Sequence, residues 1–308
     1  MSSINTNTAA LTALQSLNAT QKALETTQSR ISTGFRVSTA SDNAAYWSIA
    51  TTMRSDNKAN SVLQDALGLG AGKVDTAYTA MNSAIDVVDQ IKQKVLLAKT
   101  SSSDDRKKIQ SEISALQSQL KDNIGGASYA GSNLLKTDSS SATDTKLTVM
   151  TSYNRDSTGK VSTGTIDVKY TDTRLIDAKA GGSAGLLDTS FATTGATKMS
   201  ILNVNVGSGG ITTSTAFDNM LTGIETALKG MATGAASLGA AKARIDLQKD
   251  FISKLSDSID RGVGQLVDAD MNKESTRLQA LQVQQQLGVQ ALSIANGSTQ
   301  SILSLFRG

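Results

Sequence analysis

The spacing of mostly apolar residues in the last third of the chain is the strongest constraint on its fold. One series runs from Phe217 to Leu266 and a second from Val267 to Phe306, and in both the step alternates between three and four residues. On an α-helix this heptad repeat forms an apolar stripe along one face, and an isolated helix cannot bury such a stripe. The two series are one residue out of phase beside Gly262 and Gly264, so we expect the helix to bend or change partners there.

The N-terminal half has similar runs. The first run stops at Gly34, and a second extends from near Ile49 to Val95. The first run consists of Leu14, Leu17, Gln21, Leu24, Gln28 and Ile31. The chain contains no Pro, the residue that breaks helices most strongly. Long helices are therefore predicted at both ends of the chain.

A further helix is predicted in the segment TSSSDDRKKIQSEISALQSQLKDNIGG. Ser103 is the expected N-cap, because Asp104 and Asp105 would then lie in the first turn, where carboxylates are favourable. Gly125 is the expected end of this helix.

The middle of the chain changes character. Between about Asp138 and Thr215 it is rich in Ser, Thr and Gly, and the apolar period becomes two. Short strands are therefore predicted around two triplets, which are Ile166, Val168 and Tyr170, and Leu202, Val204 and Val206.

The predicted fold class is mainly α, with long antiparallel, coiled-coil-like helical rods from both chain ends and a small β-rich insertion in the middle. Residues 1–42 and 267–308 are the expected terminal helices. Residues 43–137 and 216–266 are the two halves of the rod, and residues 138–215 are the insertion.

The C-terminal helix has an unusual surface. The 29 residues from Leu278 to Phe306 include no charged side chain, and 13 of them are Gln, Ser, Asn or Thr. A second apolar stripe that includes Val283, Leu287 and Ile294 flanks the heptad series, so several neighbouring helices would be needed to cover both. We therefore expect both chain ends to be self-assembly elements that fold fully when copies surround them. The predicted interface residues are Leu14, Leu17, Leu24, Ile31, Leu278, Leu281, Leu292, Ile294, Ile302 and Phe306.

Other functional classes find little support. The chain has no His and no Cys, and no cluster of Lys or carboxylates stands out as a base, so neither an enzyme nor a cofactor site is expected. Its net charge is only +3, without a Lys/Arg block, which argues against nucleic-acid binding. No window approaches the roughly 18 apolar residues of a membrane span, and the first residues lack the features of a secretory signal peptide.

A metal site is also rejected. Asp268, Asp270 and Asn272 imitate the start of a calcium loop, but Lys273 stands where the loop needs Gly and Gln279 where it needs a bidentate Glu. The acidic pair is better explained by the start of a helix.

Five motifs in order resemble one protein family. They are ISTGFRVSTASDNAAYWSIATTMRSDNKA from Ile31, YAGSNLL from Tyr129, LGAAKARID from Leu238, VDADMNKES from Val267 and SILSLFRG from Ser301. On these motifs the chain resembles the bacterial flagellins over roughly Ile4 to Leu135 and Phe217 to Gly308.

The resemblance implies a structural subunit that polymerises, alone or with other flagellins, into the extracellular flagellar filament for swimming motility. It implies that paired N- and C-terminal helices form the innermost tube of the filament. It also implies export without a signal peptide through the flagellar type III apparatus. An export chaperone, the filament cap and the hook-associated proteins are the implied partners.

The same resemblance implies that host flagellin receptors recognise the region of Arg36, Ser41, Asp42 and Asn43. The family pattern has a Lys where this chain has Ser41. The segment QIKQKVLLAKTSSS also lacks the Arg-rich sequence that Toll-like receptor 5 recognises. We therefore expect weak recognition by hosts.

Two alternatives remain at the level of sequence. The hook-filament junction protein shares the terminal helices but occurs in few copies, so abundance in sheared filaments separates the two. A secreted type III translocator-like, membrane-active protein would insert its apolar ends into lipid, and liposome leakage would reveal it.

Overall fold

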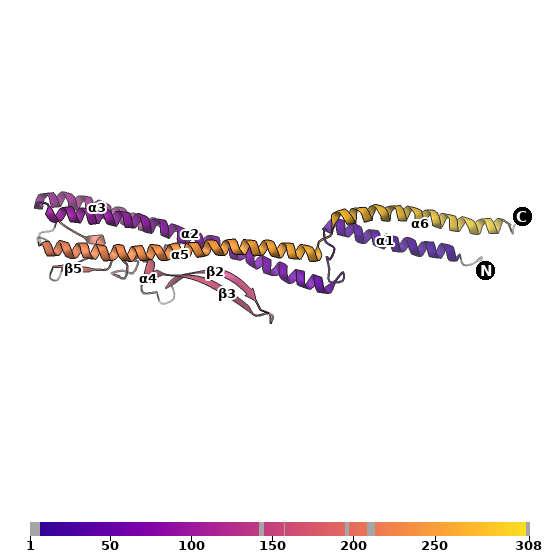
Figure 1. Cartoon of the computed structure of the whole chain (residues 1–308), viewed down its shortest axis with the longest axis horizontal. Coiled ribbons are helices and arrows are strands. Elements are labelled where there is room, and N and C mark those ends of the chain that lie inside the picture. The colour runs from indigo at the N-terminus through magenta and orange to yellow at the C-terminus, as the bar shows by residue number, and fades with distance from the viewer. Residues whose placement is uncertain (1–6, 142–144, 157, 195–196, 208–212, 306–308) are drawn as a thin grey trace. The chain divides into compact units, whose positions relative to one another are not determined.

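The computed structural model describes residues 7–141, 145–156, 158–194, 197–207 and 213–305. The chain is mainly helical (Figure 1) and forms two compact units. The terminal unit is made of Met1–Lys58 and Asp257–Gly308, and the central unit of Ala59–Ser256. Two long helices, α2 (Ala44–Thr100) and α5 (Ser214–Val267), contribute residues to both units. The predicted fold class, long helices from both ends with a small strand-containing middle, is confirmed.

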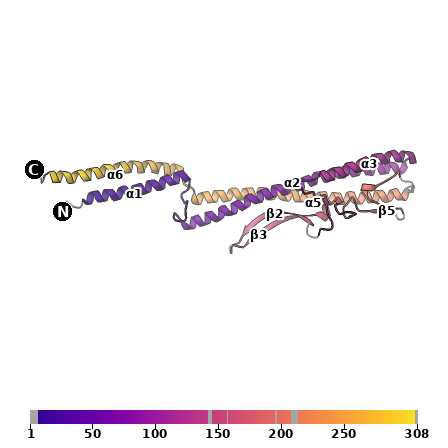
Figure 2. The same cartoon turned by 180° about the vertical axis from the view of Figure 1, so that it is seen from behind.

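In the terminal unit, α1 (Thr8–Thr33) and α6 (Met271–Leu305) lie side by side and run in opposite directions (Figures 1 and 2). The Asn7 side chain caps the start of α1 by accepting a hydrogen bond from the Ala10 N–H. The helix ends at Thr33, because Gly34 adopts φ 74° and donates its N–H to the Arg30 carbonyl. The predicted stop at Gly34 is confirmed.

The predicted joint lies at the slip between the two heptad series, directly after Val267, and not at Gly262 and Gly264 themselves. α5 continues through both glycines and ends at Val267. Glycine permits a bend but does not require one where the helix is packed. A Cβ on Gly262 would lie 3.5 Å from the Met53 methyl carbon, so neighbouring atoms already support the helix there.

The chain changes helix three residues later. Asp268 leaves the helix and pairs with Phe35 as an isolated antiparallel bridge. The Asp270 carboxylate then accepts hydrogen bonds from the N–H groups of Asn272 and Lys273, which starts α6. The expectation that the acidic pair marks the start of a helix is therefore confirmed for Asp270.

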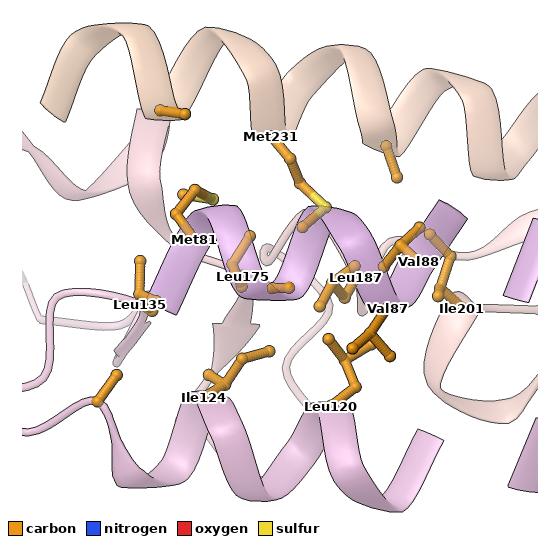
Figure 3. Close-up of a cluster of buried hydrophobic side chains, with 14 of the residues drawn as sticks. Met81, Val87, Val88, Leu120, Ile124, Leu135, Leu175, Leu187, Ile201 and Met231 are labelled. Atoms are coloured by element: carbon orange, nitrogen blue, oxygen red, sulfur yellow. The ribbon is translucent and has the colours of Figure 1, made fainter. Parts of the chain in front are cut away.

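In the central unit, α2 and α5 run antiparallel in constant register. Three ion pairs join them, and the two residue numbers of each pair add to the same value: Asp75 with Lys242, Lys92 with Glu225, and Lys99 with Asp218. α3 (Ser103–Gly126) packs on α2 and supplies further apolar side chains. Figure 3 shows the core in which these helices and the segment before α5 meet, with Met81, Val88, Leu120, Ile124, Leu175 and Met231 among its buried residues.

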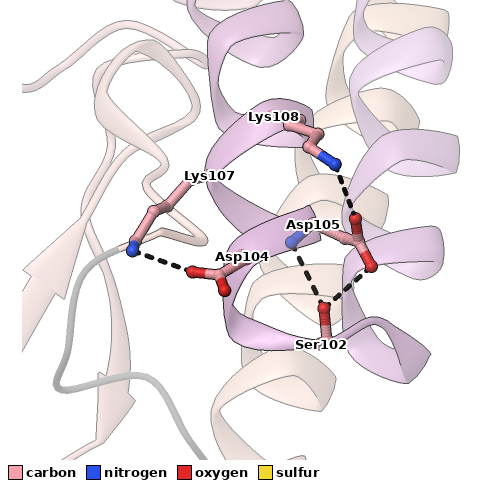
Figure 4. Close-up of polar contacts among 5 residues, drawn as sticks. All are labelled: Ser102, Asp104, Asp105, Lys107 and Lys108. Atoms are coloured by element: carbon pink, nitrogen blue, oxygen red, sulfur yellow. Dashed lines mark hydrogen bonds and ion pairs between the residues drawn. The ribbon is translucent and has the colours of Figure 1, made fainter.

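The cap of α3 lies one residue before the predicted position. The Ser102 hydroxyl accepts a hydrogen bond from the Asp105 N–H at 3.3 Å and donates to the Asp105 carboxylate at 2.8 Å (Figure 4). Ser102 is therefore the N-cap, because its hydroxyl reaches the N–H of Asp105, three residues later. Ser103, the predicted N-cap, is the first residue of the helix. The helix extends to Gly126, one residue beyond the predicted Gly125.

Among the residues that the structure describes, the strands form three two-stranded sheets. β2 (Lys146–Arg155) and β3 (Val161–Lys169) make an antiparallel hairpin with an irregularity between Met150 and Ser152. The short pairs are β1 (Lys136–Thr137) with β4 (Ile176–Asp177) in parallel and β5 (Phe191–Thr194) with β6 (Thr197–Met199) in antiparallel orientation. Ile166 and Val168 lie in β3 as predicted, whereas Tyr170 begins the one-turn helix α4 (Tyr170–Thr173).

The predicted strand around Leu202, Val204 and Val206 is wrong. Ile201–Asn203 forms a 3₁₀ helix, η1, and the residues after it are not a strand. Side chains of α3 satisfy this backbone, so it needs no partner strand. Gln117 donates to the carbonyls of Ile201 and Val204, and Gln110 accepts from the Val206 N–H.

Candidate assembly interface

The contact between α1 and α6 follows a heptad series on each helix. On α6 the buried or half-buried residues are Glu274, Leu278, Leu281, Gln285, Gly288, Leu292 and Ala295, which is the predicted series. On α1 they include Ala13, Leu17, Thr20, Leu24, Thr27 and Ile31. The helices approach closely in the middle, where a Cβ on Gly288 would lie 3.2 Å from the Leu17 Cδ1.

The α1 series differs from the prediction at its polar members. Gln21 and Gln28 are exposed, and Thr20 and Thr27 take their places toward α6. Thr27 is buried. The β-branched Thr side chain is shorter than that of Gln and carries a methyl group, so it suits a narrow contact between helices. A search for apolar residues at heptad spacing does not include Thr.

Two polar contacts fix the ends of this helix pair. The Arg30 guanidinium lies 3.2 Å from one carboxylate oxygen of Glu274, whose side chain is only 9% exposed. The other oxygen, Oε2, has no hydrogen-bond partner among the described residues. At the opposite end, the Asn7 amide donates to the Ala295 carbonyl at 2.8 Å. Both contacts join residues more than 240 positions apart, and neither was foreseen from the sequence.

The remaining surface of the pair carries exposed apolar side chains. Val283, Leu287 and Ile294 of α6 are 54%, 59% and 74% exposed, so the second stripe has no cover within the terminal unit. On α1, Leu11 and Leu14 are 59% and 46% exposed. Large exposed apolar patches are typical of protein–protein or membrane interaction sites.

The predicted interface residues therefore fall into three groups. Leu281 is buried, and the half-buried residues are Leu17, Leu24, Ile31, Leu278 and Leu292. Leu14 and Ile294 are exposed. The Ile302 side chain and Phe306 lie outside the described residues.

The loop between α1 and α2 is hydrogen-bonded to the end of α5 and to the segment that precedes α6. The N–H groups of Arg36 and Val37 donate to the Val267 carbonyl, and the Ala269 N–H donates to the Gly34 carbonyl. The Arg36 guanidinium also donates to the Leu266 carbonyl at 2.8 Å. This loop packs on a small apolar cluster whose buried members are Val37, Ala50, Val263 and Val267.

The four residues of the expected receptor region lie in or beside this loop. Hydrogen bonds from the N–H groups of Thr39 and Ser38 hold the pKa of the exposed Asp42 carboxyl below its usual range. The Asn43 side chain accepts from the Tyr46 N–H and starts α2. Asp42 and Asn43 therefore shape the loop, while the Ser41 hydroxyl shares a hydrogen bond with the nearby Thr39 hydroxyl, at 2.7 Å.

Within the part of the chain that is described, no helix combines the length and apolar character needed to cross a membrane. The same residues include no cluster of three or more acidic side chains placed to hold a metal ion.

Comparison with known proteins gives the family. Residues 4–140 match the bacterial flagellin N-terminal helical region, and residues 221–306 match the bacterial flagellin C-terminal helical region. The chain is 56% identical to a flagellin of Brucella melitensis and 46% identical to flagellin C of Rhizobium meliloti, in each case over the full length of both chains. The crystal structure of Bacillus cereus flagellin is 16% identical, with a TM-score of 0.40, over 62% of this chain and 88% of that one. This chain is a member of the bacterial flagellin family.

Proposed function

We propose that this chain assembles into the flagellar filament through the exposed apolar faces of α1 and α6. Membership of the flagellin family makes the chain a structural subunit of the filament that drives swimming. The observation that carries the proposed contact is the second stripe of α6, which keeps Val283, Leu287 and Ile294 in solvent in the single subunit.

The neutral composition of this surface supports the same conclusion. Burying an unpaired charge costs several kcal/mol, whereas amide and hydroxyl groups can form hydrogen bonds across packed helices. The segment from Leu278 to Phe306 has only the second kind of polar group. It is therefore suited to a position surrounded by helices of other subunits.

Ile294→Asp tests this role. Because Ile294 is 74% exposed, the substitution leaves the lone subunit folded, but in the filament it buries an unpaired carboxylate. We expect the critical concentration for seeded polymerisation to rise by more than about 100-fold, the equivalent of roughly 3 kcal/mol. Ala115→Asp, on the exposed face of α3, is the matched control and should polymerise like the wild type. Equal critical concentrations for the two variants would contradict the proposed contact.

A truncation ending at Asp270 tests the whole helix. We expect the truncated chain to retain the far-ultraviolet circular dichroism of the central unit and to form no filaments by electron microscopy. Normal filaments from this chain would refute the role of α6.

The partners follow from the same surface. Before assembly the exposed apolar stripe of α6 must be shielded from water, and an export chaperone would bind it. After export through the flagellar type III apparatus, the subunit would join the filament beneath the cap protein. The hook-associated proteins would contact the first subunits. Co-purification of the chaperone with the full chain, but not with the chain ending at Asp270, is the expected result.

Recognition by host flagellin receptors would involve the loop that contains Arg36, Ser41, Asp42 and Asn43. Residues 38–43 of the loop are exposed, but Ser41 supplies no positive charge. A peptide covering Gln28 to Ile49 should therefore elicit a weak immune response in plants, and a full-strength response would overturn this expectation.

A further inference from the structure

The C-terminal helix contains a chemically labile pair of residues. Asn296 is followed directly by Gly297, and this is the only Asn–Gly pair in the sequence. Both residues are exposed in α6. A Cβ built on Gly297 would meet no described atom within 4 Å. The pair therefore lies at the surface of the terminal unit, with open space around the glycine.

An Asn–Gly pair can react with itself, because glycine has no side chain to keep its backbone nitrogen away from the asparagine side chain. The Gly297 nitrogen forms a bond to the Asn296 Cγ, the bond between Cγ and Nδ2 breaks, and the amide leaves as ammonia with the proton of the Gly297 N–H. The product is a cyclic imide. Water then adds to one of its two carbonyl carbons and opens the ring, which gives aspartate or isoaspartate at position 296. The only co-reactant is water.

The helical backbone controls how fast this reaction proceeds. In an α-helix the N–H of residue 297 donates to the carbonyl four residues earlier, which holds the glycine nitrogen in the helix and away from the asparagine Cγ. The ring can close only when this turn of the helix opens, and such local opening is frequent where few contacts hold a helix. The rate of deamidation at this pair therefore reports how often the turn opens.

The turn that contains the pair is weakly held in the lone subunit. Asn7, the residue before α1, donates to the Ala295 carbonyl, so α1 begins at the level of the residue that precedes the pair. The nearby Val289 and Ile294 are 54% and 74% exposed and add little packing within the subunit. Glycine is also the poorest helix former after proline. We expect this turn to open often in the lone subunit and rarely where neighbouring copies surround α6.

The reaction would create a charge in a segment that has none. No charged side chain occurs between Leu278 and Phe306, and the new carboxyl group is ionised at neutral pH. We propose that Asn296 deamidates in subunits that remain unassembled, and that the resulting carboxylate excludes these subunits from the filament. Isoaspartate would add to the effect, because it carries the main chain through the former side chain and interrupts the helix. This inference rests on the proposed filament function and adds an irreversible chemical timer to it.

Ageing the full-length chain tests the reaction. Lone subunits and filaments are incubated side by side in neutral buffer, and the peptide that contains Asn296 is followed by mass spectrometry, with isoaspartate detected by enzymatic methylation. We expect deamidation to be at least about tenfold faster in the lone subunit. Asn82, which precedes Ser83 within the long helix α2, is the internal control and should stay intact in both samples. Equal rates at Asn296 in the two samples, or no reaction in the lone subunit, would overturn the proposal.

A substitution of the glycine confirms the route. Gly297→Ala adds a Cβ in open space and favours the helix, so the chain should fold as before while the nitrogen is hindered. We expect deamidation of the lone Gly297→Ala subunit to be at least about tenfold slower than that of the wild type. An unchanged rate would show that the backbone nitrogen of the glycine is not the attacking group.

Seeded polymerisation tests the consequence of the charge. When an aged mixture is polymerised on fresh seeds, modified subunits should remain in the supernatant and unmodified ones should enter the filament. Asn296→Asp should raise the critical concentration at least about tenfold relative to Asn296→Gln, which is neutral at the same position. Ageing should raise the critical concentration of the wild type but not that of Asn296→Gln.

The outcomes separate the timer from the filament function. Equal entry of modified and unmodified subunits, or equal critical concentrations for Asn296→Asp and Asn296→Gln, would overturn the exclusion and leave the function intact. Failure of the fresh wild-type chain to form filaments would instead contradict the function.

Discussion

Replacing Arg30 should weaken the filament far more than neutralising its partner Glu274. The Glu274 side chain is 9% exposed, one of its oxygens lies 3.2 Å from Arg30, and the other has no hydrogen-bond partner among the described residues. Arg30→Met retains much of the side chain's length and removes the charge. It leaves a carboxylate between two helices with nothing to compensate it.

The magnitude follows from this burial. Breaking a buried ion pair by removing one partner costs about 3–5 kcal/mol. The Arg30 side chain is 27% exposed, so water partly screens the pair, and we expect about 2–3 kcal/mol. This corresponds to a rise of about 30- to 150-fold in critical concentration. Glu274→Gln keeps an acceptor and removes the buried charge, so it should cost about 1 kcal/mol, or about fivefold.

The assay is the critical concentration of seeded polymerisation for both single variants and for Arg30→Met combined with Glu274→Met. The double variant should polymerise better than Arg30→Met alone, because apolar side chains of similar length can replace a buried ion pair. If Arg30→Met is harmless, or if the double variant is worse than either single one, the reasoning about the buried charge is refuted.

Two further predictions concern stability. Gly234→Ala places a Cβ 2.5 Å from the Asp172 carbonyl oxygen and should destabilise the central unit by about 1–3 kcal/mol. Gly68→Ala, in open space on α2, should stabilise it by about 0.5–1 kcal/mol; urea unfolding followed by circular dichroism compares the two, and equal effects would contradict the contact. Asp42 has a pKa held below 3.8 by N–H groups including that of Thr39, so its contribution to loop stability is fully present above about pH 4 and is lost as the pH falls through the lowered pKa. Amide exchange at Thr39 should therefore accelerate on acidification in the wild type but show no such transition in Asp42→Asn, and identical pH profiles would exclude this role.

Heptad spacing predicted the helix pair because α6 follows it with little interruption. Its buried or half-buried series, including Leu278, Leu281 and Leu292, and its exposed stripe, including Val283 and Ile294, are both visible in the sequence. α1 was harder to predict, because Thr20 and Thr27 take the positions that the predicted heptad series gave to Gln21 and Gln28. A polar residue in a helix contact gives no periodic signal of its own.

Tertiary contacts explain the remaining differences. The helix change after Val267 coincides with the slip between the two heptad series. Its backbone pairing with Phe35 joins residues distant in sequence and could not be predicted from either segment alone. Val204 and Val206 alternate as a strand would, but the side chains of Gln117 and Gln110 satisfy that backbone. The Arg30–Glu274 pair depends on the register of α1 on α6, which neither segment reveals alone.

Amide hydrogen exchange tests the central claim most directly, in the lone subunit in dilute buffer and in the assembled filament. The claim is that α1 and α6 are held mainly by neighbouring copies, since much of their apolar surface is exposed in the single subunit. We predict that the amides of residues 8–33 and 271–297 exchange rapidly in the lone subunit, while the core of the central unit is protected, and that assembly protects both segments. Equal protection of both segments in the lone subunit and in the filament would contradict the account.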